Sequence, residues 1–241
     1  MLNIHILTLF PEFFESPLNV SIIKRARDNG LIRIELIDIR DFSHDKHKKV
    51  DDYPYGGGCG MVMKPEPIFE AVEYVDKKIN TMNRRIILLS PQGVIFNQTL
   101  ARNLSKEQHL VFICGHYEGI DERVKTIVTD EISIGDYILT GGEAPALAIV
   151  DATVRFVPDV LGSSESPENE SFCDGLLEYP HYTRPEIYRG LKVPDVLLSG
   201  NHKEIELYRQ KEALRRTREK RPDLFKRFEL TDKDKKLLEL E

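Results

Sequence analysis

The stretch LVFICGHYEGIDERVK, Leu110 to Lys125, determines the expected fold. Its first five residues form an apolar run short enough to be a strand buried on both faces of a sheet. Gly115 to Gly119 then supplies a glycine-bounded turn, and Ile120 to Lys125 follows as a short helix. The stretch therefore predicts one strand–turn–helix unit.

The same unit recurs along the first two thirds of the chain, and this alternation predicts an α/β layer structure with a parallel sheet. Alternating or apolar runs indicate further strands, whereas helical spacing or capping residues indicate further helices. The expected strands are Leu2–Ile6, Ile32–Leu36, Ile86–Leu89 and Ile132–Tyr137. The expected helices are Ser16–Asn29, a segment capped by Asn97 and ending at Leu104, and Glu143–Phe156, with turns at Pro91–Gly93 and Gly141–Gly142 and a loop at Arg40–Tyr55.

Length and composition limit the class of protein. The 241 residues are 41% hydrophobic and 31% charged, which excludes general disorder and allows one large domain with a small appendage. No apolar run approaches the ~18 residues of a membrane span, and the first residues do not resemble a signal peptide. Cys59, Cys114 and Cys173 are spaced for neither a disulfide framework nor a zinc site. We therefore expect a cytoplasmic protein that is not attached to a membrane.

The composition changes at Gly162. The next nine residues are rich in serine and glutamate and contain no apolar side chain, which predicts a linker. Between Asn201 and Phe228 there are ten Lys or Arg against five acids, 10 − 5 = +5, although the whole chain has a net charge of −6. A basic, helix-rich end on an acidic protein indicates an anionic partner.

Three glycine-containing loops are the main candidate binding site: Ser90–Gly93, Gly115–Gly119 and Gly135–Gly142. The last two follow predicted strands, and ligands of open α/β sheets bind beyond the strand ends. Each loop alone could be only a tight turn, but three in succession favour a nucleotide-like ligand. The dinucleotide and P-loop glycine patterns are missing from the sequence, and the loops are poor in Lys and Arg. A nucleoside-type cofactor without phosphates fits best.

Other candidate sites are weaker. Tyr55–Met61 contains four glycines and is either a surface loop or a segment clamped by substrate. His44 and His47 lie in a charged loop without a third convincing ligand, so no metal site is predicted.

The reactive candidates that remain are Arg155, Glu170 and Asp174. Their ordinary interpretation is an ion pair for the arginine and solvated linker carboxylates for the two acids.

Several motifs together resemble the bacterial tRNA (guanine-N1-)-methyltransferase family. They are YGGGCGMVMKPEP at Tyr55–Pro67, SPQG at Ser90–Gly93, CGHYEGIDERV at Cys114–Val124, DEISIGDYILTGGEAP at Asp130–Pro145, PHYTRP at Pro180–Pro185 and VPDVLLSGNH at Val193–His202. They extend through nearly the whole chain, and several exceed ten residues. The resemblance implies methyl transfer from S-adenosylmethionine to N1 of guanine at tRNA position 37.

For the fold, the resemblance implies a methyltransferase of the SPOUT class: a parallel α/β sheet with a C-terminal trefoil knot, followed by a small helical domain. The implied domains are residues 1–161 for the knotted cofactor-binding domain, 162–175 for the linker and 176–241 for the tRNA-binding domain. It also implies a homodimer with active sites at the subunit interface. The knot does not follow from periodicity, because knotted connections are rare.

The resemblance also assigns the cofactor site to the glycine loops. The S-adenosylmethionine residues that it implies are Leu89, Ser90, Pro91, Gly115, Tyr117, Glu118, Gly119, Ile134, Gly135, Tyr137, Leu139, Gly141, Gly142 and Pro145.

For catalysis, Arg155 matches the family's catalytic arginine. The family's general base is an aspartate directly before a Ser-Phe pair, whereas here Glu170 precedes Ser171-Phe172 and Asp174 is the alternative base. Two other functions remain open: a non-catalytic RNA-binding or regulatory protein that senses a nucleoside, and methylation of another RNA by the same fold.

Overall fold

The computed structural model describes residues 1–81, 83–162 and 170–239. The chain forms two compact units, residues 1–164 and residues 165–241. Each unit has its own hydrophobic core.

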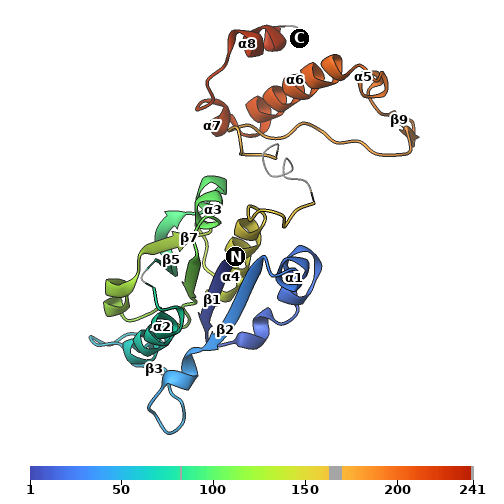
Figure 1. The fold of residues 1–241 in the computed structure, drawn as a ribbon. Helices are drawn as coiled ribbons and strands as arrows, with labels where there is room; N and C mark the ends of the chain where they lie inside the picture. The colour runs from blue at the N-terminus through green and yellow to red at the C-terminus, as the bar shows by residue number, and fades with distance from the viewer. Residues whose placement is uncertain (82, 163–169, 240–241) are drawn as a thin grey trace. The chain divides into compact units, whose positions relative to one another are not determined.

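The first unit is built on a five-stranded sheet with the order β2-β1-β6-β5-β7 (Figure 1). All four strand pairings are parallel, as the alternating pattern predicts. The strands are β1 Leu2–Thr8, β2 Ile32–Asp38, β5 Arg85–Ile95, β6 His109–Ile113 and β7 Asp130–Ser133. A separate two-stranded antiparallel pair joins β3 Asp51–Asp52 to β4 Val62–Met63.

Helices cover both faces of this sheet, which gives three layers. One face packs on helices that follow β1, β5 and β7, and the other packs on α2. The helices are α1 Ser21–Asp28, α2 Pro65–Ile79, α3 Gln98–Leu104 and α4 Glu143–Val154, and the 3-10 helices are η1 Pro11–Phe14, η2 Pro17–Asn19, η3 Ile39–Phe42 and η4 Glu122–Ile127. β6 is buried along its whole length, as expected for a strand covered on both faces.

The structure confirms several local expectations. Asn97 caps α3, because its side-chain oxygen accepts a hydrogen bond from Leu100 N–H at 3.0 Å. The α4 helix begins at Glu143 as predicted and ends at Val154, two residues before the expected Phe156. These elements follow signals that are local in sequence.

Other expected elements differ from the observed ones in type, position or length. The helix expected over Ser16–Asn29 is a 3-10 turn followed by α1, because Val20 adopts an extended conformation between them. The helix expected over Ile120–Lys125 is the 3-10 helix η4, which lies two residues later and which Asp121 caps by accepting from Arg123 N–H at 3.0 Å. Pro91–Gly93 is not a chain reversal, since β5 continues to Ile95 with a shift in register.

The α2 helix was missed, although the sequence contains a signal for it. Pro65 stands at the helix start, where proline is favoured. Ile68, Ala71, Val72 and Val75 follow at helical spacing and are all buried against the sheet. The expected loop at Arg40–Tyr55 is mostly irregular but includes the end of η3 and strand β3.

A pair of buried histidines stacks on the α2 side of the sheet. The rings of His5 on β1 and His109 on β6 lie 5.8 Å apart between centroids. Nδ1 of His5 is 3.2 Å from the Glu35 carboxylate, which also pairs with Lys78 of α2. Burial lowers the pKa of both imidazoles, although Glu35 opposes the shift at His5. Both rings are therefore neutral at pH 7.

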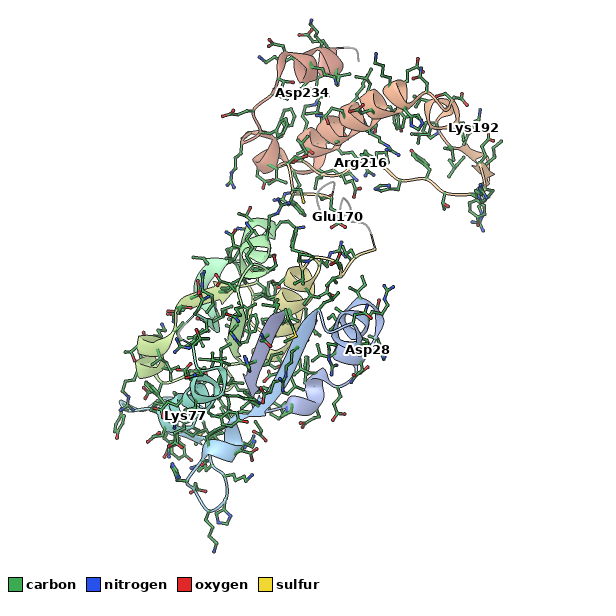
Figure 2. All side chains as sticks on the ribbon, in the orientation of Figure 1. Asp28, Lys77, Glu170, Lys192, Arg216 and Asp234 are labelled. Carbon is green, nitrogen blue, oxygen red and sulfur yellow. The ribbon has the colours of Figure 1, made fainter. Side chains whose placement is uncertain are left out.

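Residues 170–239, the described part of the second unit, form a hairpin and four helices (Figure 1). They are β8 Ile187–Tyr188, β9 Leu191–Lys192, α5 Asp195–Leu198, α6 His202–Lys220, α7 Pro222–Phe225 and α8 Asp232–Glu239. Leu176, Ala213 and Leu214 form the centre of its core. Figure 2 labels Asp234 on α8, which accepts a hydrogen bond from Gln210 of α6 at 3.0 Å and so fastens the last helix to the long one.

Candidate cofactor pocket

One pocket of about 660 Å³ lies at the carboxyl ends of β6 and β7 and beside β5. All fourteen residues assigned above to the cofactor site line this pocket. The sequence therefore identified three loops that meet around one cavity, where open α/β sheets bind their ligands. Ten further residues line the pocket and were not among those fourteen: Leu88, Gln92, His116, Ile120, Glu122, Lys125, Ile132, Ser133, Ile138 and Thr140. Gln92, His116, Ile138 and Thr140 nevertheless lie inside the three predicted loops. Most of them lie inside the quoted motifs, so their position in the loops was the available signal.

The floor of the pocket is a tight contact between two of the glycine loops. Gly142 N–H donates to Gly115 O at 2.8 Å, and residues His116 and Gly141 form a bridge beside them. A Cβ atom at Gly142 would lie 2.7 Å from the Cα of Cys114, which is backbone that cannot rotate away. Glycine is required here because the two loops approach too closely for any side chain.

The second loop is fixed by the glycine-rich segment Tyr55–Met61. Glu118 N–H donates to Met61 O at 3.0 Å, and the Glu118 side chain covers Gly60 so closely that a Cβ there would be 2.4 Å away. Gly60 also has φ +82°, a backbone conformation that favours glycine. Tyr55, at the other end of the segment, is fully exposed. The segment is thus a surface loop at one end and a support of the pocket wall at the other.

The third loop folds back on itself after β7. Gly135 has φ +148° and accepts a hydrogen bond from Tyr137 N–H at 3.0 Å, and the Tyr137 ring covers it. Ser133 Oγ accepts from Gly135 N–H at 3.2 Å. These bonds turn the chain sharply after β7, and glycine allows the turn.

A buried carboxylate supports the pocket from below. Glu143, at the start of α4, accepts a hydrogen bond from the Thr8 hydroxyl at 2.8 Å, and both residues are buried. Burial, with a smaller contribution from Glu143, raises the pKa of the Cys114 thiol well above its ordinary value. Cys114 is therefore a neutral core residue and not a nucleophile, in agreement with its apolar sequence context.

The charged side of the pocket is organised around Lys125. Its ammonium is 2.8 Å from Gln92 Oε1, 3.0 Å from Glu122 Oε1 and 3.5 Å from Glu131 Oε2. The hydrogen bond with Glu122 is the main cause of a raised pKa for Lys125. The two carboxylates balance its charge, so this lysine does not create a phosphate site.

The three catalytic candidates belong to different units. Arg155 directly follows α4 in the first unit, as the C-cap of that helix. Glu170 and Asp174 belong to the second unit, where the Glu170 carbonyl accepts a hydrogen bond from Cys173 N–H at 3.2 Å (Figure 2). Asp174 is exposed and lines a shallow pocket with Arg227. Their catalytic assignment stays a prediction. Most of the expected linker, residues 163–169, lies outside the described residues.

Within the described ranges, no three or more His, Cys, Asp or Glu side chains are grouped so as to hold a metal ion. No helix in those ranges combines the length and apolarity needed to cross a membrane. Cys59 and Cys114 are free thiols, the first exposed and the second buried.

The fold and pocket define a parallel α/β protein with a glycine-lined pocket at the carboxyl ends of its strands. The profile of the tRNA (guanine-1)-methyltransferase TrmD family matches residues 2–227. The chain is 59% identical over 239 residues to a tRNA (guanine-N(1)-)-methyltransferase of Dictyoglomus turgidum, covering 99% of this chain and 96% of the relative. A relative of the same name from Anoxybacillus flavithermus is 56% identical, with 99% and 97% covered. The chain belongs to the tRNA (guanine-1)-methyltransferase family.

Proposed function

We propose that this protein transfers a methyl group from S-adenosylmethionine to N1 of the guanine at position 37 in the tRNA anticodon loop. The products are N1-methylguanosine and S-adenosylhomocysteine. The main observation behind the proposal is that all fourteen predicted cofactor residues line one pocket, in a chain that belongs to this family. The names of the relatives support the tRNA substrate and the guanine N1 acceptor. Such an activity belongs in the cytoplasm.

The pocket is suited to S-adenosylmethionine. Its volume of about 660 Å³ is within the usual range for a cofactor site, and glycine backbone lines its floor. Among the described residues that line it, Lys125 is the one Lys or Arg, and two carboxylates balance its charge. The surroundings therefore suit a nucleoside without phosphates. When bound, S-adenosylmethionine supplies a methyl group on a positively charged sulfur.

The protein's own residues would activate the guanine. N1 of guanine carries a proton at neutral pH and becomes a good nucleophile once that proton leaves. The carboxylate of Glu170, or of Asp174, would accept it, a contribution typically of 10²–10⁴-fold. Loss of the proton places negative charge on O6, where the Arg155 guanidinium would stabilise it. Binding both reactants in one orientation supplies proximity.

The second unit would bind the tRNA. Seven of its ten basic residues between Asn201 and Phe228 lie on α6, and the other three, Arg221, Lys226 and Arg227, flank α7. They offer cations to phosphate groups. The target guanine must be splayed out of the anticodon loop to reach the catalytic groups, as is usual for enzymes that act on bases. We assign residues 176–241 to tRNA binding and residues 162–175 to a linker.

The proposal also includes a trefoil knot in the first unit and a homodimer with shared active sites. The bond from Gly142 to Gly115 and the bridge from His116 to Gly141 support a knot, since they hold the two loops against each other. Ile138 is 81% exposed and Val94 is 64% exposed in the same unit, and a second copy would cover such side chains. Mixing inactive Arg155→Ala and Glu170→Gln chains would restore activity if each site uses both subunits.

The test of the function is methyl transfer from labelled S-adenosylmethionine to an unmodified tRNA transcript and to a ribosomal RNA fragment. Label in the tRNA alone is the expected result. Label only in the ribosomal fragment would favour methylation of another RNA. Cofactor binding without transfer to either RNA would favour the nucleoside sensor.

The general base is tested by comparing Glu170→Gln with Asp174→Asn. If Glu170 is the base, its variant loses turnover while S-adenosylhomocysteine still binds with normal affinity. Near-normal turnover in Glu170→Gln together with loss in Asp174→Asn would transfer the role to Asp174.

A further inference from the structure

A segment of the pocket wall is pushed out of the sheet. Leu89 and Val94 of β5 both pair with Ile132 of β7, so the four residues Ser90–Gly93 between them are extruded from the ladder. This extruded segment lines the pocket through Ser90, Pro91 and Gln92. Strand pairing does not fix its conformation, and other contacts must do so.

Three contacts fix the extruded segment. Ser90 Oγ accepts a hydrogen bond from Gln92 N–H at 3.1 Å, which closes a local turn. Gly93 packs on the backbone of Glu131 so closely that a Cβ would be 2.4 Å away. The third contact reaches the tip of the segment from another element, since Lys125 Nζ of η4 donates to Gln92 Oε1 at 2.8 Å.

Lys125 is itself held in place. Its side chain is 24% exposed and lies between Glu122, also on η4, and Glu131 of β7. Glu131 Oε2 is buried and, within the described part of the chain, receives no hydrogen bond, so the ammonium 3.5 Å away compensates its charge. The lysine thus joins η4, β7 and the extruded segment at one side of the pocket.

We propose that Lys125 is a positioning residue for the cofactor, because its bond to Gln92 holds Ser90–Gly93 in the conformation that binds S-adenosylmethionine. The inference rests on the proposed function for the identity of the ligand. Lys125 acts through Gln92 and takes no part in proton or methyl transfer. Its loss should therefore weaken cofactor binding and leave turnover at saturation nearly unchanged.

The chain offers a matched set of variants. Gln92→Ala and Lys125→Met each remove the bond, whereas Gln92→Glu keeps an acceptor and Lys125→Arg keeps a donor. Lys77→Met is the control, because Lys77, labelled in Figure 2, is an exposed lysine of α2 that pairs with Glu73 at 3.9 Å. Neither residue is part of the pocket lining. Thermal unfolding of every variant measures any general loss of stability.

The first measurement is hydrogen exchange of the ligand-free protein. Amides in Ser90–Ile95 should exchange faster in Gln92→Ala and Lys125→Met and at the wild-type rate in Gln92→Glu, Lys125→Arg and the control. The second is the affinity for S-adenosylhomocysteine, which should fall about tenfold in the two bond-breaking variants, the scale of a hydrogen bond to a charged group. In the double variant the loss should be no larger than in either single one.

Unchanged exchange in Lys125→Met, or losses of affinity that multiply in the double variant, would overturn the proposal. So would a loss in Gln92→Ala that appears in kcat and not in the KM for the cofactor. Wild-type protein that binds no S-adenosylhomocysteine would instead overturn the proposed function. Binding by the wild type with unchanged affinity in all variants would overturn the positioning role alone.

Discussion

Replacing Gly142 by alanine tests the close contact at the pocket floor. Gly142 has φ −81° and ψ −4°, values that alanine adopts without strain, so the substitution adds only volume. The new Cβ would lie 2.7 Å from Cys114 Cα and 2.9 Å from Gly115 N. All of these atoms are backbone, so relief requires the two loops to separate.

The expected cost follows from that separation. Forcing one methyl group into a packed site typically costs about 1–3 kcal/mol. Lengthening the 2.8 Å bond from Gly142 N–H to Gly115 O adds up to roughly 1 kcal/mol. We expect the free energy of unfolding to fall by about 2–3 kcal/mol, which lowers Tm by roughly 4–12 °C for a unit of this size. Affinity for S-adenosylhomocysteine should fall as well, because both glycines line the pocket.

The assay is calorimetric unfolding of the full chain, with denaturant unfolding as a second measure. Gly162→Ala is the matched control, since a Cβ at Gly162 would meet nothing within 4 Å, and it should leave Tm unchanged. A Tm for Gly142→Ala within 1 °C of the wild type would refute the reasoning, because the loops would then have room that the structure denies them.

Three further predictions concern the first unit. Thr8→Val removes the hydroxyl that donates to buried Glu143, so the free energy of unfolding should fall by about 1–3 kcal/mol in denaturant titrations. Asn97→Ala removes the cap of α3 and should cost about 1 kcal/mol in the same titrations. Folding lowers the pKa values of His5 and His109 below 6.5. As the pH falls below 6.5, the unfolded chain therefore takes up protons at these histidines before the folded chain does. Unfolding measured from pH 7.5 to 5 should therefore show stability decreasing below 6.5.

Each of these predictions has a contrasting variant. Thr8→Ser keeps the donor and should retain most of the stability, and equal losses in both variants would contradict a role for the hydroxyl. Asn97→Asp keeps a capping oxygen and should match the wild type. Replacing both histidines by glutamine should flatten the pH dependence between 7.5 and 5, and an unchanged slope would show that other groups cause it.

The parallel sheet could be predicted because its signals are local. Leu110–Cys114 is apolar without interruption, and such runs form strands that are covered on both faces. Asn97 predicts its own cap, since the bond it makes spans only three residues. Where local signals compete, the sequence predicted the bounds of the elements less accurately. Val20 interrupts an apparently continuous helical pattern, and only the conformation of its backbone shows this.

The pocket was found through its glycines, whereas its charged side was missed. The glycine loops follow strands, so their meeting at one edge of the sheet follows from topology. Lys125 and Gln92 lie thirty-three positions apart in sequence, and no spacing rule joins them. Likewise, the bond between Thr8 and Glu143 spans 135 positions and depends on the packing of β1 beside α4. Contacts of this kind come from tertiary structure alone.

The most direct measurement of the central claim identifies the methylated atom. The protein would be incubated with methyl-labelled S-adenosylmethionine and two tRNA transcripts, one with guanine and one with adenine at position 37. The RNA would then be digested to nucleosides and analysed. The account predicts labelled N1-methylguanosine from the first transcript and no label from the second. Equal labelling of both transcripts, or label on a guanine atom other than N1, would contradict it.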